Sequence, residues 1–143
     1  MYKHTQHVPS IILTACGMLG SFAAQKAPKP LRTVTGLSIA GALYTFRCLT
    51  VTVDQSNIIM DFGKWLRVKS IPLDSIESCK IKETNALIGW GIHFVGDGWL
   101  YRVSGQEAVR VKLKSGERIY IGSDEPIELA DAINKSLAVL QRI

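Results

Sequence analysis

The stretch EAVRVKLKSGERIYI, residues 107–121, decides the fold because it reads as a complete β-hairpin. Apolar side chains occupy every second position of 109–113, which is the period of a strand with one buried face. The Ser-Gly dipeptide that follows predicts a tight turn into a second strand over 118–121. We therefore expect the part of the chain around this hairpin to consist mainly of antiparallel strands.

The same alternation, interrupted by turn residues, recurs upstream of the hairpin. It predicts further strands over 49–53, 77–82, 92–95 and 99–103, and strand structure over 60–69 with a bend or second turn at Gly63-Lys64. Downstream, apolar residues recur every three or four positions over 127–140, which indicates an amphipathic helix. The predicted fold class is mainly β (α+β), with a partly open antiparallel β barrel capped by this C-terminal amphipathic helix.

An apolar segment precedes the β-rich part. Residues 8–24 (VPSIILTACGMLGSFAA) and 33–46 (TVTGLSIAGALYTF) carry no charge, and the connector QKAPKPLR between them contains two helix-ending prolines. At about 1.5 Å per residue, the two helices would be roughly 25 and 21 Å long. The sequence therefore predicts a short apolar helical hairpin within residues 1–48 and a β-barrel domain with its C-terminal helix in residues 49–143.

The hairpin is expected to supply transmembrane helix segments that anchor the protein in the cell membrane. Small residues that would let two membrane helices approach closely are Gly17, Gly20, Gly36 and Gly41. Both helices are slightly short for a hydrocarbon core of about 30 Å. The alternative is therefore a soluble homo-oligomer in which the N-terminal helices form the subunit interface.

Processing and topology each have competing interpretations. Ser21-Phe22-Ala23 has the small residues of a signal-peptidase site, and the four residues ending at Cys16 are similar to a lipoprotein cleavage box. The basic connector of the hairpin favours a cytoplasmic connector and an external folded domain. A free thiol at Cys79 favours a cytoplasmic folded domain instead.

The excess of positive charge lies entirely at the front of the chain. The net charge is +5, and residues 1–48 hold five basic and no acidic residues, whereas residues 49–143 hold twelve of each. A domain that binds nucleic acid needs a basic stripe that neutralises several phosphates, so no nucleic-acid partner is expected. The three cysteines are widely spaced without a CxxC pair, which argues against a disulfide framework and a zinc site.

Several short motifs carry a family resemblance. They are Gly-Trp-Gly at 89–91, Val-Ser-Gly at 103–105, Ile-Gly-Ser-Asp-Glu-Pro at 121–126 and the linker IPLDSIE at 71–77. Together with apolar helices ahead of the first strand, they make the chain similar to the bacterial pleckstrin-homology-like domain family, in its membrane-anchored type. The resemblance implies a fold that serves as a binding or assembly module, with the folded domain in the cytoplasm.

Two sets of side chains are candidates for binding. Arg110, Lys112, Lys114 and Arg118 form a basic row that could contact an anionic surface, or could be only the solvated face of a hairpin. Trp65, Trp90 and Trp99 are candidates for aromatics at a membrane or partner interface, or for wedges in the core. Phosphoinositide binding, which eukaryotic relatives of the fold achieve with basic residues between their first two strands, is not supported because residues 54–57 (DQSN) contain none.

No catalytic arrangement is predicted. His93 and Asp97 are the only candidate acid/base couple in the β-rich part, and no nucleophile motif surrounds Ser104 or Cys79. Neither a Gly-rich phosphate loop nor a cluster of metal ligands is apparent, so no cofactor is expected. The sequence predicts a non-enzymatic, membrane-associated binding or scaffolding module, which has either a protein partner or further copies of itself.

Overall fold

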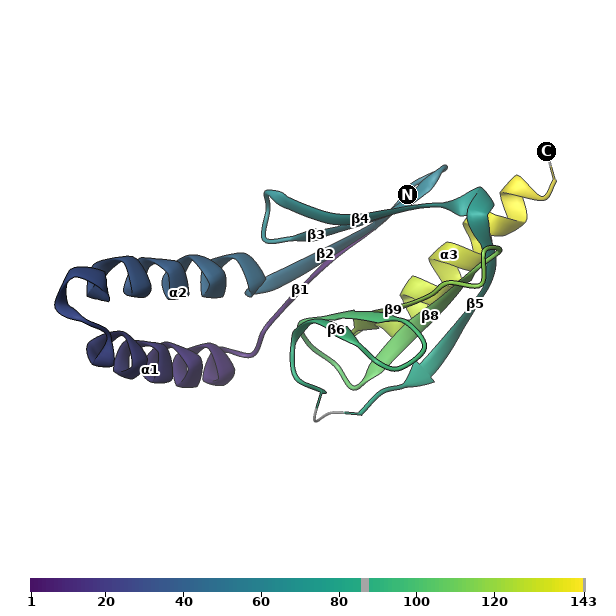
Figure 1. Ribbon diagram of the computed structural model, residues 1–143. Coiled ribbons are helices and arrows are strands. Elements are labelled where there is room, and N and C mark those ends of the chain that lie inside the picture. Colours follow the sequence, from purple (N-terminus) through teal and green to yellow (C-terminus); the bar gives the residue numbers. More distant parts are fainter. Residues whose placement is uncertain (86–87, 143) are drawn as a thin grey trace.

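Two β-sheets and a projecting helical hairpin make up the computed structural model, which describes residues 1–85 and 88–142 (Figure 1). The first sheet has the order β1-β2-β3-β4 and contains β1 (Tyr2–His7), β2 (Cys48–Val53), β3 (Asn57–Phe62) and β4 (Leu66–Pro72). The second has the order β5-β8-β9-β7-β6 and contains β5 (Ile76–Glu83), β6 (Gly91–Phe94), β7 (Trp99–Arg102), β8 (Glu107–Leu113) and β9 (Arg118–Ser123). Neighbouring strands are antiparallel, except that β7 and β9 are parallel.

The expected α+β class with a C-terminal helix is confirmed, but the strands do not close into a barrel. They form two separate sheets in the described residues, joined where the chain leaves β4 and makes the short turn η2 (Leu73–Ser75). Pro72 ends β4, and because it has no backbone N–H it cannot extend the ladder of hydrogen bonds. The chain therefore turns there and begins the second sheet at β5.

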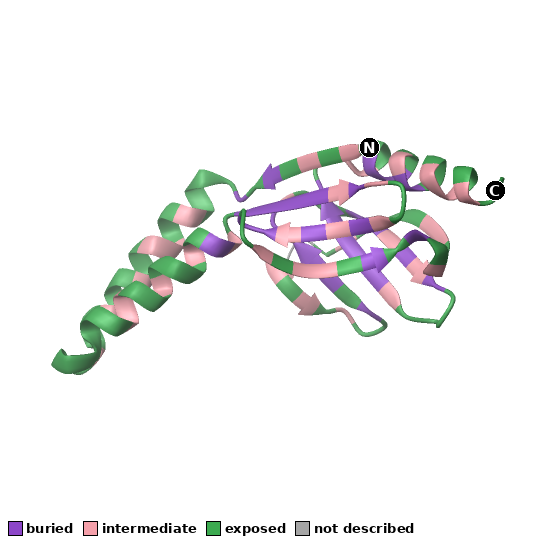
Figure 2. Cartoon of the chain, turned by 90° about the horizontal axis from the view of Figure 1, so that it is seen from above, coloured by how far each residue is buried: buried purple, intermediate pink, exposed green. Residues whose placement is uncertain are grey.

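The core lies between the two sheets and helix α3 (Pro126–Leu140), where Figure 2 shows the buried residues. Val109 and Val111 of β8 are buried in it, as the alternation of the sequence predicts. Helix α3 contributes Leu129 and Ile133, which are also buried. Ile127 was expected in the same apolar stripe, but it is 62% exposed, whereas Ala130 and Ile133 of that stripe are buried.

Strand β1 is the element that the sequence does not predict. It pairs antiparallel with β2 over its whole length, from Tyr2 opposite Val53 to His7 opposite Cys48. The buried side chain of Gln6 donates a hydrogen bond to the carbonyl of Gly122 in β9 and accepts one from the hydroxyl of Ser104. The β-rich body thus includes residues 2–7, which the expected division at residue 48 placed with the helical segment.

The helical hairpin is inserted between the paired strands β1 and β2. It consists of α1 (Ser10–Lys26), the single turn η1 (Lys29–Leu31) and α2 (Arg32–Phe46). At its base, the backbone N–H of Val8 donates to the carbonyl of Arg47, with 2.8 Å between N and O. Figures 1 and 2 show the hairpin extending away from both sheets.

The expected transmembrane helix is wrong. Within the described residues, no helix is both long enough and apolar enough to cross a membrane. Helix α1 has 17 residues and α2 has 15, because the connector with Pro28 and Pro30 separates them. The two short apolar helices were predicted from the sequence, and the prediction that they cross the membrane is the part that fails.

We expect Gln6→Ala to lower the free energy of unfolding by about 1–3 kcal/mol, because two buried hydrogen bonds are lost. Chemical denaturation would measure this change. Lys3→Ala, at an exposed position of the same strand, is the matched control and should change stability by less than about 0.5 kcal/mol. Equal effects of the two substitutions would contradict the role given to Gln6.

Candidate functional site

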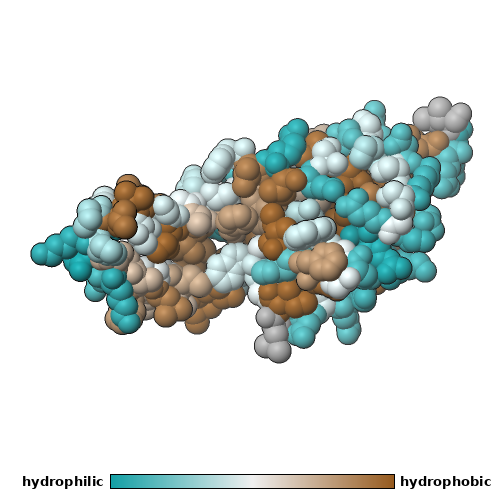
Figure 3. All heavy atoms as spheres, viewed as in Figure 1, coloured by the Kyte–Doolittle hydropathy of each residue, from teal (hydrophilic) through white to brown (hydrophobic). Residues whose placement is uncertain are grey.

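The surface of the helical hairpin is the first candidate site, because it is apolar and exposed. No residue of α1 is buried, and Thr45 is the only buried residue of α2. The large apolar side chains that are exposed on the hairpin are Ile11, Ile12, Met18, Leu19, Phe22, Leu31, Val34, Leu37 and Tyr44. Figure 3 shows hydrophobic atoms over both helices on the side in view. Apart from Lys26 and Arg32 at the tip, neither helix contains a charged residue, so the hairpin lacks the charged face that a surface helix normally presents to water.

Four hydroxyl groups of the hairpin donate hydrogen bonds to its own backbone. Thr14 donates to the carbonyl of Ser10, Ser21 to Gly17, Ser38 to Val34 and Thr45 to Gly41, with O···O distances of 2.8–2.9 Å. Each bond runs back one helical turn, which is the local pattern that Ser and Thr adopt in helices. The O–H donors of these four side chains are therefore satisfied within the helices.

Glycines shape the contact between the two helices. A Cβ atom placed on Gly20 would lie 2.6 Å from Cγ2 of Ile39, so this position allows α1 and α2 to approach closely. A Cβ atom on Gly17, Gly36 or Gly41 would meet nothing within 4 Å. Only Gly20 of the four expected glycines is therefore required for packing within the hairpin.

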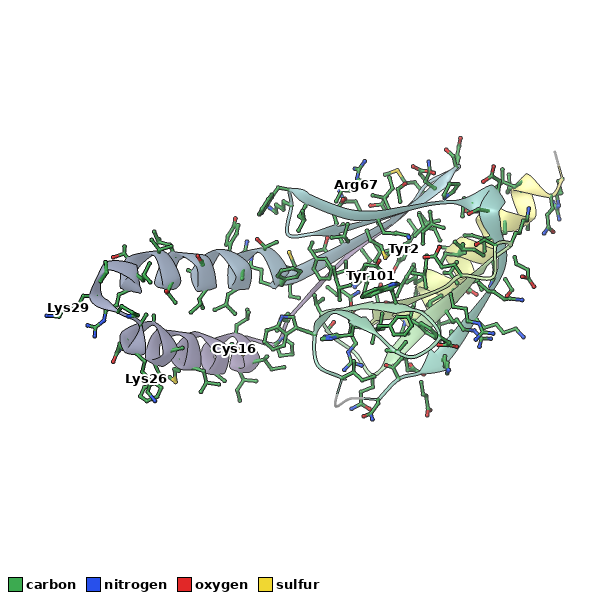
Figure 4. The ribbon with its side chains drawn as sticks, in the orientation of Figure 1. Tyr2, Cys16, Lys26, Lys29, Arg67 and Tyr101 are labelled. Carbon is green, nitrogen blue, oxygen red and sulfur yellow. The ribbon has the colours of Figure 1, made fainter. Side chains whose placement is uncertain are left out.

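The charges of the hairpin gather at its tip. Lys26 and Lys29 lie at the end that is furthest from the sheets, as Figure 4 shows, and Arg32 begins α2 beside them. The ammonium group of Lys26 lies 4.7 Å from the centre of the Phe22 ring, and Arg32 donates to the carbonyl of Ala27. Neither helix contains an acidic residue, so the hairpin is apolar along its length and positive at its tip.

The expected basic row is divided by the structure. Arg110 and Lys112 lie on one face of β8, Arg118 lies opposite Lys112 on β9, and Lys114 follows β8 in the turn. Two of the four are held by acids: Lys112 Nζ lies 2.8 Å from Glu77 Oε1, and Arg118 NH1 lies 2.6 Å from Asp97 Oδ2. These two cations are therefore partly neutralised.

The sequence analysis missed two further cations beside this row. Strand β5 pairs with β8 and places Lys80 opposite Arg110 and Lys82 opposite Ala108. The sequence of β5 shows that Lys80 and Lys82 lie on the same side of the strand. It does not show that β5 pairs with β8, a strand that begins 24 residues after β5 ends. Their position beside Arg110 follows only from the sheet.

Asp97 binds two side chains of β9. Its carboxylate accepts hydrogen bonds from Arg118 and from the hydroxyl of Tyr120, which lies 2.9 and 3.0 Å from its two oxygens. The hydrogen bond from Arg118, followed by that from Tyr120, lowers the pKa of Asp97. Arg118 is thus engaged in holding the β6–β7 turn to β9.

The three tryptophans occupy different surroundings and do not form one site. Trp65 is 67% exposed between β3 and β4. Trp90 is half-buried and packs against the main core. Trp99 is 45% exposed and forms an edge-to-face pair with Phe94, whose ring centre lies 5.5 Å away. Trp65 and Trp99 remain available to a partner, whereas much of Trp90 stabilises the body.

The groups considered for catalysis are not brought together. A ring nitrogen of His93 lies 2.8 Å from the carbonyl oxygen of Trp90, while Asp97 is held by Arg118 and Tyr120. Burial raises the pKa of the Cys79 thiol to about 12, which leaves it protonated and a weak nucleophile. In residues 1–85 and 88–142, no three His, Cys, Asp or Glu side chains are grouped so that they could hold a metal ion.

Comparisons of the chain with known protein families, with curated proteins and with solved structures find no match.

Asp97→Asn should lower the midpoint of thermal unfolding near pH 7, because the neutral amide replaces a carboxylate that binds Arg118 and Tyr120. Folding lowers the pKa of this carboxyl, so the carboxylate stabilises the folded state. This stabilisation is fully present above the unfolded pKa of roughly 3.9 and is lost as the pH falls through the folded pKa. The difference between the two proteins should therefore shrink below about pH 4. Exposed Asp131→Asn is the control, and an equal effect there would contradict this account.

Proposed function

We propose that the protein is a non-enzymatic, membrane-associated binding or scaffolding module whose hairpin α1–α2 docks into the lipid of the cell membrane. The observation that carries this proposal is the exposed, apolar surface that surrounds both helices. A protein in water rarely exposes so continuous an apolar surface, and such surfaces mark sites of contact with membranes or other proteins. Burial would contribute about 1.5–3 kcal/mol for each large apolar side chain that is removed from water.

The distribution of charge favours lipid as the partner of the hairpin. Both helices lack acidic residues, and Lys26, Lys29 and Arg32 surround the tip. A hairpin that lies along the boundary between headgroups and acyl chains would bury its apolar length and let these long side chains reach the phosphates. Four hydroxyl groups of the hairpin already donate to their own helices, which lowers the cost of moving them into lipid.

A homo-oligomer remains the second candidate function, and one observation favours it. Gly17 and Gly36 are open to the surface and line a groove between α1 and α2 together with Ala24 and Ala40. A helix of a second copy could approach such a groove closely, because small residues leave the backbones uncovered. The absence of acid and the basic tip are better matched by lipid, so the membrane proposal stands first.

The role of the β-rich body is proposed from its resemblance to pleckstrin-homology-like domains. Two sheets followed by one packed helix support that resemblance, and such a fold would present a protein-binding surface beside the membrane. Three free cysteines support a cytoplasmic position for this body. The β2–β3 turn, residues 54–57, contains no basic residue that could bind a phosphoinositide. Its Asp54 carboxylate instead accepts hydrogen bonds from the backbone N–H groups of Ser56 and Asn57.

Phe22→Asp should reduce binding of the full chain to neutral phosphatidylcholine vesicles by at least about tenfold, because a charge replaces an exposed aromatic side chain that lipid would bury. Co-flotation with vesicles would measure the bound fraction. Val139→Asp is a matched control, since Val139 of α3 is 60% exposed, as Phe22 is, but lies outside the hairpin. The control should bind vesicles as the unchanged protein does.

Mass determination of the same proteins in buffer without detergent separates the two candidate functions. If no form binds vesicles and the unchanged chain is a discrete oligomer that Phe22→Asp dissociates, the hairpin is a subunit interface and the membrane proposal fails. Equal loss of vesicle binding in the two variants would also count against the hairpin as the contact site.

A further inference from the structure

The outer face of the second sheet, which α3 does not cover, carries a compact group of cations. Its basic residues come from three adjacent strands, and we refer to them together as the basic face: Lys80, Lys82, Arg110, Lys112 and Arg118. Neighbouring strands lie about 4.8 Å apart, so the basic face is roughly 10 Å wide. Along the strands, the basic face extends over the four residue steps from the level of Ala108 to that of Lys112. At about 3.3 Å per residue, its length is about 13 Å.

Two members of the basic face oppose each other without an acid between them. Lys80 lies directly opposite Arg110 in the β5–β8 register, which places their Cβ atoms about 5 Å apart. Neither has an acidic side chain within 4 Å among the described residues, where the ion pairs of this face are Lys112–Glu77 and Arg118–Asp97. Like charges that face each other across a sheet are destabilising. An anion bound at this point would relieve that repulsion.

A second cluster of buried side chains lies beside the basic face. Leu100, Ala108 and Tyr120 are buried on the same side of the sheet, beneath Ile88 and Val95. Lys82 lies over the ring of Tyr120, with 5.4 Å between its ammonium nitrogen and the ring centre. The cations are thus presented by a sheet whose side chains are packed on both faces, and not by a loop.

The basic face and the hairpin lie toward the same side of the molecule. In Figure 1, α1 and the second sheet lie below α2 and the first sheet. Because the core lies between the two sheets, the outer face of the second sheet is turned away from the first sheet. Figure 4 shows Lys26 on the lower side of α1. A membrane surface that follows this side would meet α1, its basic end and the outer face of the second sheet together.

We propose that the basic face contacts anionic lipid headgroups and so sets the orientation of the body on the membrane; this inference rests on the proposed docking of the hairpin. Lys80 and Arg110 supply the charge that lipid phosphates would neutralise, and each basic residue near an anionic surface strengthens binding several-fold. The basic face is too short to follow the six to ten phosphates that strong nucleic-acid binding requires. Anionic lipid is therefore the partner that its size and charge fit best.

The test compares vesicles of pure phosphatidylcholine with vesicles that contain phosphatidylglycerol, using the full chain. The double variant Lys80→Gln/Arg110→Gln should bind the anionic vesicles about 30-fold more weakly and the neutral vesicles equally well. Lys64→Gln/Lys135→Gln is the matched control, because it removes the same charge from exposed positions outside the basic face. Raised salt should weaken only the part of binding that depends on anionic lipid.

The unfolding temperature of the double variant gives an independent readout. It should equal or exceed that of the unchanged protein, because a repulsion between like charges is removed. A lower unfolding temperature would mean that Lys80 and Arg110 stabilise the body, and would overturn the inference. So would an equal loss of anionic-vesicle binding in the double variant and its control.

Failure of this inference can be told apart from failure of the proposed function. If the protein binds neutral and anionic vesicles equally, the hairpin docks but the basic face does not contact lipid. If a loss in the double variant is seen only with a single-stranded oligonucleotide, the basic face binds nucleic acid and the inference fails. Binding to neither kind of vesicle would overturn both proposals.

Discussion

The pairing of β1 with β2 is the constraint on which the rest of this structure depends. The hairpin is inserted between two strands that are hydrogen-bonded neighbours, so both of its helices leave the body side by side. Paired strands are about 4.8 Å apart, whereas helices normally pack at 8–10 Å. The two helices therefore begin close together, and at Gly20 they still lie so close that a Cβ atom would meet Ile39.

The same strand also connects the hairpin to the second sheet. Gln6 bonds to the carbonyl of Gly122, and the ring nitrogens of His4 lie 2.8 Å from Asp124 and 3.3 Å from Glu125 at the start of α3. These contacts tie the strand that enters α1 to both the second sheet and the C-terminal helix. The direction of the hairpin is consequently fixed relative to the basic face, and not only relative to the sheet from which the hairpin emerges.

The features that could be predicted from the sequence are those that depend on local periodicity: the strands around residues 107–121, the amphipathic α3 and the two apolar helices. Strand β1 could not be predicted, because YKHTQH has no apolar alternation and becomes a strand only by pairing with residues 41 or more positions away. The pairing of Lys80 with Arg110 is likewise a property of register, which no single strand reveals. The transmembrane prediction failed on length, since the prolines of the connector limit both helices.

The hairpin and the basic face would make complementary contributions to membrane association. A hairpin that is apolar on all sides is stabilised by lipid in any rotation about its own axis, because apolar burial has no preferred direction. Burial therefore sets how deeply the hairpin enters the lipid, but not which side of the body faces the membrane. A directional interaction must supply that choice, and the opposed cations Lys80 and Arg110 are a source because they lie on one side of the body. The opposed cations of β5 and β8 cost stability in the free protein and gain it against an anionic surface, so the body has its lowest free energy when that side faces the lipid.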